Sequence, residues 1–167
     1  GRLIDTKQFD ILINIYKRIC SLNQDWILII LGEGPKRNDL EKIITDQKLK
    51  GRVFILGWVS NMKYWFKKSN VFAFTSRLEG FPNSLQQAVF FKLPSISFNC
   101  KTGPRQLIIN NKTGFIINNF DEKEYQKKLN LLMSNEKLRI LFSKNSSKII
   151  KKFDKKKIVT KWKQYFK

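Results

Sequence analysis

The alternation of short apolar runs with amphipathic segments constrains the fold of this chain more than any other feature. The run WILIIL at 26–31 contains no polar residue and ends at Gly32. Strands that are apolar on both faces are typical of parallel sheets with helices on both sides. The sequence therefore predicts an α/β fold with a parallel sheet. The expected strands are 26–31, 52–56, 71–75, 95–98 and 115–117, and the expected helices are 6–22, 38–48, 62–68, 83–91 and 104–110.

The two ends of the chain depart from this alternation. A doubly wound sheet normally opens with a central strand, but no strand precedes the first helix here. We therefore expect the first strand to lie before residue 1, which leaves a gap in the sheet. At the other end, three Lys-rich helices are expected at 121–133, 136–150 and 155–166. The whole chain, 1–167, is interpreted as one domain with an α/β core (1–120) and a helical tail (121–167).

Composition removes several classes of site. The chain has no histidine, which excludes His-based zinc sites and Ser-His-Asp triads from it, and its two cysteines have no metal-binding spacing. The net charge of +20 suits phosphate ligands or an anionic membrane face, although the amino-acid usage of an AT-rich genome explains it as readily. No nucleic-acid-binding motif is present, so that class of partner is not expected. No apolar stretch is long enough for a membrane span, and a cytoplasmic location is expected.

The segment 75–88 carries the most chemical information. A strand ends there, a loop with Gly80 and Pro82 follows, and a helix begins near Asn83. Ligands of open α/β sheets lie beyond the carboxyl ends of the strands, and the free N–H groups of a first helical turn suit a phosphate. Glu79 adds acceptors for sugar hydroxyls. An ordinary strand–loop–helix turn with a solvated glutamate is the alternative interpretation of these residues.

The five residues from Glu79 to Asn83, EGFPN, resemble the signature loop of retaining GT-B glycosyltransferases of the family 4, or "glycosyl transferases group 1", type. That family usually has a second glutamate eight positions later, where this chain has Gln87. The resemblance covers nearly the whole chain, and its ordered combination of motifs is specific. Its other elements are Gly1-Arg2-Leu3 with Lys7, 31–35, 56–59, Leu93-Pro94, Cys100, 102–104 and 113–115.

The resemblance implies a Rossmann-like C-terminal half of a GT-B fold, whose partner N-terminal acceptor domain is absent from this sequence. It implies a hexosyltransferase-type activity that uses a UDP- or GDP-linked sugar without a metal or other cofactor. Arg2 and Lys7 would bind the diphosphate and stabilise the leaving group. Gln87 would face the ribose. The implied donor-binding residues are Gly32, Trp58, Val59, Glu79, Gly80, Phe81, Pro82, Asn83, Ser84, Leu85 and Gln87, and no general base is assigned.

Several alternatives remain open at this stage. Arg2 and Lys7 could be ordinary surface charges, and Trp58 could be a core or rim aromatic. A degenerate nucleotide-sugar-binding module without catalysis is the second functional hypothesis, and the fragment alone is expected to be inactive. The acceptor is expected to be a glycan or a polyprenyl-diphosphate-linked saccharide. Aromatic residues 162, 165 and 166 among lysines could contact the inner face of the cytoplasmic membrane, or could pack on the domain.

Overall fold

The strands form two parallel sheets in the computed structural model, which describes residues 1–150, 159, 160 and 162–164. One sheet has two strands and the other has three in the order β3-β4-β5, so the predicted parallel arrangement is confirmed. The division into two sheets agrees with the gap that the sequence analysis expects in the sheet. The strands are β1 (Leu28–Ile30), β2 (Val53–Ile55), β3 (Phe72–Phe74), β4 (Ser95–Phe98) and β5 (Gly114–Ile117).

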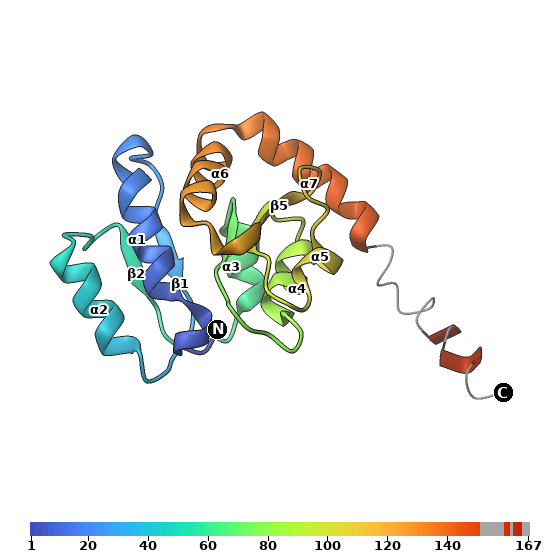
Figure 1. Cartoon of the computed structure of the whole chain (residues 1–167), viewed down its shortest axis with the longest axis horizontal. Helices are drawn as coiled ribbons and strands as arrows, with labels where there is room; N and C mark the ends of the chain where they lie inside the picture. The colour runs from blue at the N-terminus through green and yellow to red at the C-terminus, as the bar shows by residue number, and fades with distance from the viewer. Residues whose placement is uncertain (151–158, 161, 165–167) are drawn as a thin grey trace.

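Helices alternate with the strands along the chain, beginning with α1 before β1, and pack around the two sheets (Figure 1). Short 3₁₀ turns occupy Asp5–Lys7, Cys20–Leu22 and Asn118–Phe120. The α-helices are α1 (Phe9–Ile19), α2 (Arg37–Asp46), α3 (Met62–Lys68), α4 (Asn83–Phe90), α5 (Pro104–Leu107), α6 (Glu122–Ser134) and α7 (Glu136–Ile150).

Local backbone geometry explains where the observed helices are shorter than predicted. The helix expected from residue 6 begins at Phe9, because Gln8 adopts a left-handed conformation with φ of 52°. The helix expected to reach residue 110 ends at Leu107, where Ile108 becomes extended. Of the helix expected at 155–166, only 159, 160 and 162–164 are described, and these are helical. The remainder of that prediction lies outside the described residues.

The main core joins the start of the chain to the helices that follow residue 120. The buried face of α1, which includes Leu12 and Tyr16, packs against α6. From α6, the side chains of Tyr125 and Leu132 are fully buried in the same cluster. The first helix of the expected tail is therefore an integral part of the α/β core. Every residue of β4 is buried, as expected for a central strand of a parallel sheet.

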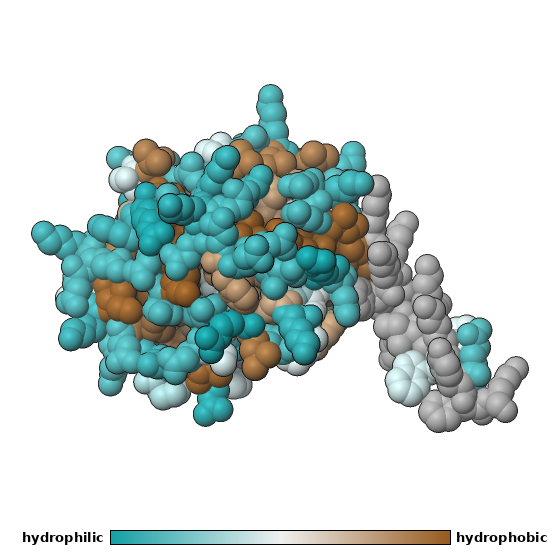
Figure 2. Space-filling model, viewed as in Figure 1, coloured by the Kyte–Doolittle hydropathy of each residue, from teal (hydrophilic) through white to brown (hydrophobic). Residues whose placement is uncertain are grey.

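The surface is predominantly polar. Hydrophilic residues cover most of the face shown in Figure 2, and the chain carries 33 Lys and Arg against 13 Asp and Glu. Within the described part of the chain, no helix combines the length and the apolarity needed to cross a membrane.

Candidate functional site

Lys7 and Glu79 meet at the carboxyl ends of the strands although 72 positions separate them. Lys7 Nζ donates to Glu79 Oε1 at 2.5 Å. The two side chains are 22% and 10% exposed, which makes this the least exposed ion pair among the described residues. The loop after β3 and the 3₁₀ turn at the start of the chain thus place a cation and an anion side by side and partly buried. A hollow of about 310 Å³, lined by 99–103, Arg105 and Gln106, lies next to Glu79, and this hollow together with the ion pair is called the crevice below.

Hydroxyl groups from two strand ends hold the backbone of both charged residues. The buried Thr75, directly after β3, donates to the carbonyl oxygen of Lys7 at 2.9 Å. The N–H of Arg77 donates to the carbonyl oxygen of Thr6 at 2.9 Å. On the other side, the hydroxyl of Thr102, in the loop after β4, donates to the carbonyl oxygen of Glu79. Each of these hydrogen bonds contributes about 0.5–1.5 kcal/mol to stability and holds the backbone near Lys7 or Glu79 in place.

The loop before α4 presents its backbone to the crevice. Gly80 and Asn83 are exposed, and Phe81 is 37% exposed. Pro82 is buried against Gly103, whose φ of +99° and tight contact with the proline ring require glycine. No side chain of the described residues caps α4. The N–H of Asn83 donates to the carbonyl oxygen of Phe81 at 3.0 Å, so the N–H groups of the first turn that are available to an anion are those of Ser84 and Leu85.

The remaining predicted residues of α4 differ in exposure. Ser84 is half-buried, and Leu85 is fully buried in a core cluster, so only the backbone of Leu85 can face a ligand. Gln87 is exposed on the helix. A side chain there is free to meet a ligand that lies along the crevice.

Gly32, Trp58 and Val59, which are predicted to bind the donor, follow the neighbouring strands β1 and β2. Gly32 N–H donates to the carbonyl oxygen of Gly57 at 2.8 Å, which joins the two loops. Trp58 is 86% exposed, so the interpretation of this ring as a core aromatic is wrong. Val59 is half-buried. A Cβ at Gly32 would collide with the carbonyl oxygen of Gly1, so glycine is required for residues 1–3 to approach this end of β1.

The two predicted cations are placed differently. Lys7 lies in the crevice, whereas Arg2 is exposed and takes part in no ion pair among the described residues. The chain at this point is nevertheless fixed, because the N–H of Leu3 donates to the carbonyl oxygen of Glu33 at 2.8 Å. The structure thus brings Lys7 to Glu79 and leaves the Arg2 side chain on the surface.

Cys100 borders the crevice but is poorly suited to act as a nucleophile. Its thiol is buried after β4 and contacts the carbonyl oxygen of Thr102 at 3.5 Å. Burial, and then the negative charge of Glu79, raise the pKa of this thiol. The neutral thiol therefore predominates near neutral pH, and the thiolate is the nucleophilic form.

Sequence reasoning assigned no role to Thr75 or Thr102. The signal that could have identified them is a hydroxyl residue placed one or a few positions after an apolar strand, next to the glycine-containing loop. Their partners come from elsewhere in the chain, so the interactions themselves become visible only in the folded structure.

Comparison with protein families gives one match that spans most of the chain. The model of the family "Glycosyl transferases group 1" matches residues 1–149.

Individual relatives are similar over a smaller share of their own length. The chain is 40% identical over 108 residues to an uncharacterized glycosyltransferase of Methanocaldococcus jannaschii, which covers 65% of this chain and 27% of that protein. It is 31% identical over 139 residues to a Campylobacter jejuni N-acetylgalactosamine-N,N'-diacetylbacillosaminyl-diphospho-undecaprenol 4-alpha-N-acetylgalactosaminyltransferase, covering 83% of this chain and 37% of that protein. The chain thus spans well under half of either relative.

A solved structure extends the similarity to the fold. Staphylococcus aureus TarM, in a complex with fondaparinux, alpha-GlcNAc-glycerol and UDP, superposes with a TM-score of 0.93 at 29% identity. The match covers 99% of this chain and 34% of TarM.

Proposed function

Because the chain belongs to the glycosyl transferases group 1 family, we propose that its crevice binds the nucleoside diphosphate sugar that a retaining glycosyltransferase uses as donor. The single observation that carries this proposal is the Lys7–Glu79 pair at the carboxyl ends of the strands. A cation suits a diphosphate, a carboxylate suits sugar hydroxyls, and the pair sits beside uncapped helix N–H groups.

Lys7 has donors left for the phosphate while it contacts Glu79. An ammonium group has three N–H donors, and one of them serves the carboxylate. In the proposed reaction, the bond between the anomeric carbon and the phosphate oxygen breaks, and that oxygen leaves with the bonding pair as nucleoside diphosphate. Lys7 and the first turn of α4 stabilise the developing negative charge. The acceptor hydroxyl forms the new bond on the same face of the sugar, and its proton passes to the departing phosphate oxygen.

For the finer identity of the substrates, the names and bound ligands of similar proteins support a proposal. The TarM complex contains UDP, and we propose a UDP-linked hexose as donor, with a GDP-linked hexose as the alternative base. The Campylobacter relative is named for a diphospho-undecaprenol-linked substrate. We propose a glycan or polyprenyl-diphosphate-linked saccharide as acceptor, with its binding site supplied by a separate acceptor domain. No metal or other cofactor is part of this proposal, and a peripheral position at the inner membrane face would suit such an acceptor.

Calorimetric titration of the chain with UDP, UDP-glucose and UDP-N-acetylglucosamine tests the proposal. Lys7→Ala should weaken UDP binding about 10- to 100-fold, the loss expected for a charge-assisted hydrogen bond. Lys42→Ala, which removes an equal charge from the exposed face of α2, is the matched control and should change affinity less than about twofold. If a chain that circular dichroism shows to be folded binds neither UDP- nor GDP-sugars, the proposal is wrong.

A second candidate, donor binding without transfer, is favoured by Gln87. The family usually has a carboxylate at this exposed position of α4, and the amide accepts hydrogen bonds from ribose hydroxyls less strongly. Transfer assays on this chain joined to an acceptor domain of a related glycosyltransferase, with and without Gln87→Glu, separate the two candidates. Activity confined to the variant would establish the degenerate module.

A further inference from the structure

The hollow beside Glu79 has only positively charged residues in its lining. These are Lys101 and Arg105, and the other side chains that line it are neutral. Neither cation forms an ion pair among the described residues. The carboxylate of Glu79, in contrast, already contacts Lys7. The hollow therefore presents two cations whose charge no carboxylate of the described part of the chain neutralises.

Neutral amides hold the Arg105 side chain in place. Its Nε donates to Asn99 Oδ1 at 3.1 Å, and one of its Nη groups donates to Asn118 Oδ1 at 3.3 Å. The amide of Asn99 in turn donates to Asn118 Oδ1 at 2.9 Å, which joins the ends of β4 and β5. These bonds use two of the five donors of the guanidinium and leave its positive charge in place. A side chain that is held in this way loses less conformational entropy when an anion binds to it.

The floor of the hollow is buried, whereas its two cations lie at its rim. Cys100 and Gly103 are buried, and Asn99 is half-buried. Lys101 and Arg105 are exposed. An anionic group that binds at this rim keeps part of its hydration and so avoids the large cost of burying a charge completely.

The hollow adjoins the residue that is proposed to hold the donor sugar. Thr102, in its lining, donates to the carbonyl oxygen of Glu79, while Lys7 contacts the carboxylate of the same residue. Burial raises the pKa of the Cys100 thiol in this lining, and the charges of Glu79 and Lys7 shift it further in opposite directions, so both charges lie near the hollow. Because Lys7 is the cation proposed for the diphosphate, the cations of the hollow are left for another group of the substrate.

We propose that the hollow binds a carboxylate carried by the donor sugar, so that the donor is a nucleoside diphosphate hexuronic acid. The planar fork of Arg105 would pair with this carboxylate, and Lys101 would add a second positive charge. An uncharged hexose would offer the two cations only a hydroxyl group. The inference rests on the proposed function, because that function places the donor sugar at Glu79.

Calorimetric titration with UDP-glucose and UDP-glucuronic acid, which differ only at carbon 6, tests this assignment. UDP-glucuronic acid should bind about three- to tenfold more tightly, the gain expected for a charge-assisted pair at a partly exposed site. The ratio of the two Kd values is the readout, since both donors carry the same diphosphate. If the chain binds only GDP-linked donors, GDP-mannose and GDP-mannuronic acid give the same comparison.

Removal of both cations should abolish this preference. In the double variant Lys101→Gln, Arg105→Gln, the sugar carboxylate would meet the negative charge of Glu79 without a compensating cation, so UDP-glucuronic acid should bind no more tightly than UDP-glucose. Lys42→Gln, which removes a charge from the exposed face of α2, is the matched control and should leave the ratio unchanged. Arg105→Lys keeps the charge but loses the fork, and should retain only part of the preference.

A second variant covers the case in which the double variant does not fold. The Lys101 side chain makes no hydrogen bond or ion pair within the described part of the chain, so Lys101→Gln alone should leave the fold intact. It should lower the preference about twofold. Amide chemical shifts of residues 99–103, 105 and 106 should change more with UDP-glucuronic acid than with UDP-glucose.

The outcomes separate this inference from the proposed function. Equal Kd values for the two donors, in a folded chain that binds UDP, would overturn the inference and leave the proposed function standing. A preference for UDP-glucuronic acid that survives the loss of both cations would also overturn it. If the folded chain binds neither UDP- nor GDP-sugars, the proposed function is wrong, and this inference is wrong with it.

Discussion

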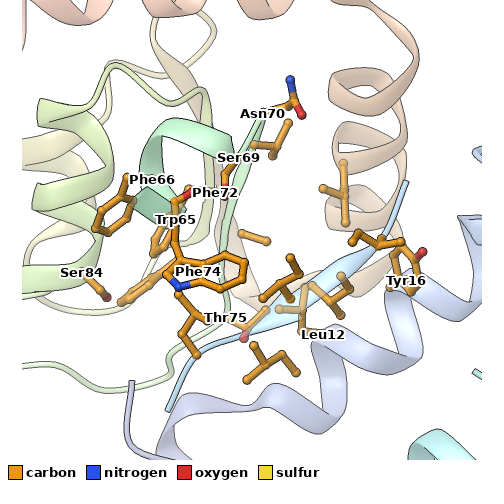
Figure 3. Close-up of a pocket in the computed structure, with 18 of the residues that line it drawn as sticks. Leu12, Tyr16, Trp65, Phe66, Ser69, Asn70, Phe72, Phe74, Thr75 and Ser84 are labelled. Carbon is orange, nitrogen blue, oxygen red and sulfur yellow. Dashed lines mark hydrogen bonds between the residues drawn. The ribbon is translucent and has the colours of Figure 1, made fainter. Parts of the chain in front are cut away.

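The crevice at Lys7 and Glu79 differs in chemistry from a second pocket, of about 490 Å³, which is called the slot and lies between β1 and β3 with Leu12, Trp65 and Phe74 in its lining (Figure 3). Both regions include residues of the segment 1–7. The crevice offers an ion pair, uncapped helix N–H groups and exposed loop backbone. The slot offers half-buried apolar side chains between two strand edges. The crevice presents charged groups, and the slot presents apolar surface. One stretch of chain, 1–7, therefore borders two regions of opposite chemistry.

The two regions also differ in how completely they are built. Hydroxyl groups from Thr75 and Thr102 already hold the crevice in place. The two strands that border the slot, in contrast, are not paired with one another within the described part of the chain, unlike β3 and β4. We therefore expect substitutions near the crevice to change ligand affinity. Substitutions near the slot should lower the free energy of unfolding only slightly.

The largest expected effect compares the two kinds of strand. Replacing Ile96, which is fully buried in β4, with alanine should lower the free energy of unfolding by about 2–5 kcal/mol. Ile29→Ala in β1, where the side chain is half-buried, should cost less than half of that. Urea unfolding of both variants measures the difference. Equal losses of unfolding free energy would mean that β1 is as fully packed as β4, which would contradict the expected difference between the two strands.

The next effect concerns the hydroxyl that supports Lys7. Thr75→Val keeps the shape and leaves the carbonyl oxygen of Lys7 without this donor, which should cost about 1–3 kcal/mol of unfolding free energy. UDP affinity should fall several-fold with it, because Lys7 is less well positioned. The matched control is Thr45→Val, whose hydroxyl bonds the carbonyl of Glu41 on an exposed helix and should matter little. A larger loss in the control would contradict the role of Thr75.

A smaller effect separates phosphate from sugar recognition. Glu79→Gln removes the charge that Lys7 now contacts, so UDP alone should bind up to about tenfold more tightly. A UDP-sugar should gain less, because its hydroxyls lose a charged acceptor. Competitive titration of the two ligands reports the change in preference. Weaker UDP binding in a folded variant would show that Glu79 assists, and does not compete with, the phosphate.

The smallest expected effect is at Gln87. Replacement by glutamate should strengthen UDP binding about two- to fivefold if this exposed side chain meets the ribose, because a carboxylate is the stronger acceptor. Thymidine diphosphate, which lacks the ribose 2′-hydroxyl, should gain less from the same change. An equal gain for both nucleotides would place the effect elsewhere than at the ribose.

Local patterns in the sequence were sufficient to predict most of the fold. The runs around Leu28 and Ile96 predicted the strands, and α3, β4 and α7 have the bounds expected from the sequence. What could not be predicted depends on partners distant in the chain. The left-handed Gln8 shortens α1, Thr75 and Thr102 find their acceptors across the fold, and Leu132 ties the expected tail to the core. The motifs suggested both members of the Lys7–Glu79 pair, but only the structure shows their contact.

The most direct test of the central claim is a map of amide chemical-shift changes when UDP is added to the isotopically labelled chain. Binding at the Lys7–Glu79 pair should give the largest changes at Lys7 and at the amides of residues 80, 81 and 83–85, with the slot residues Ile29 and Ala73 nearly unaffected. Changes concentrated at Ile29 and Ala73, with Lys7 and 80–85 unmoved, would contradict it.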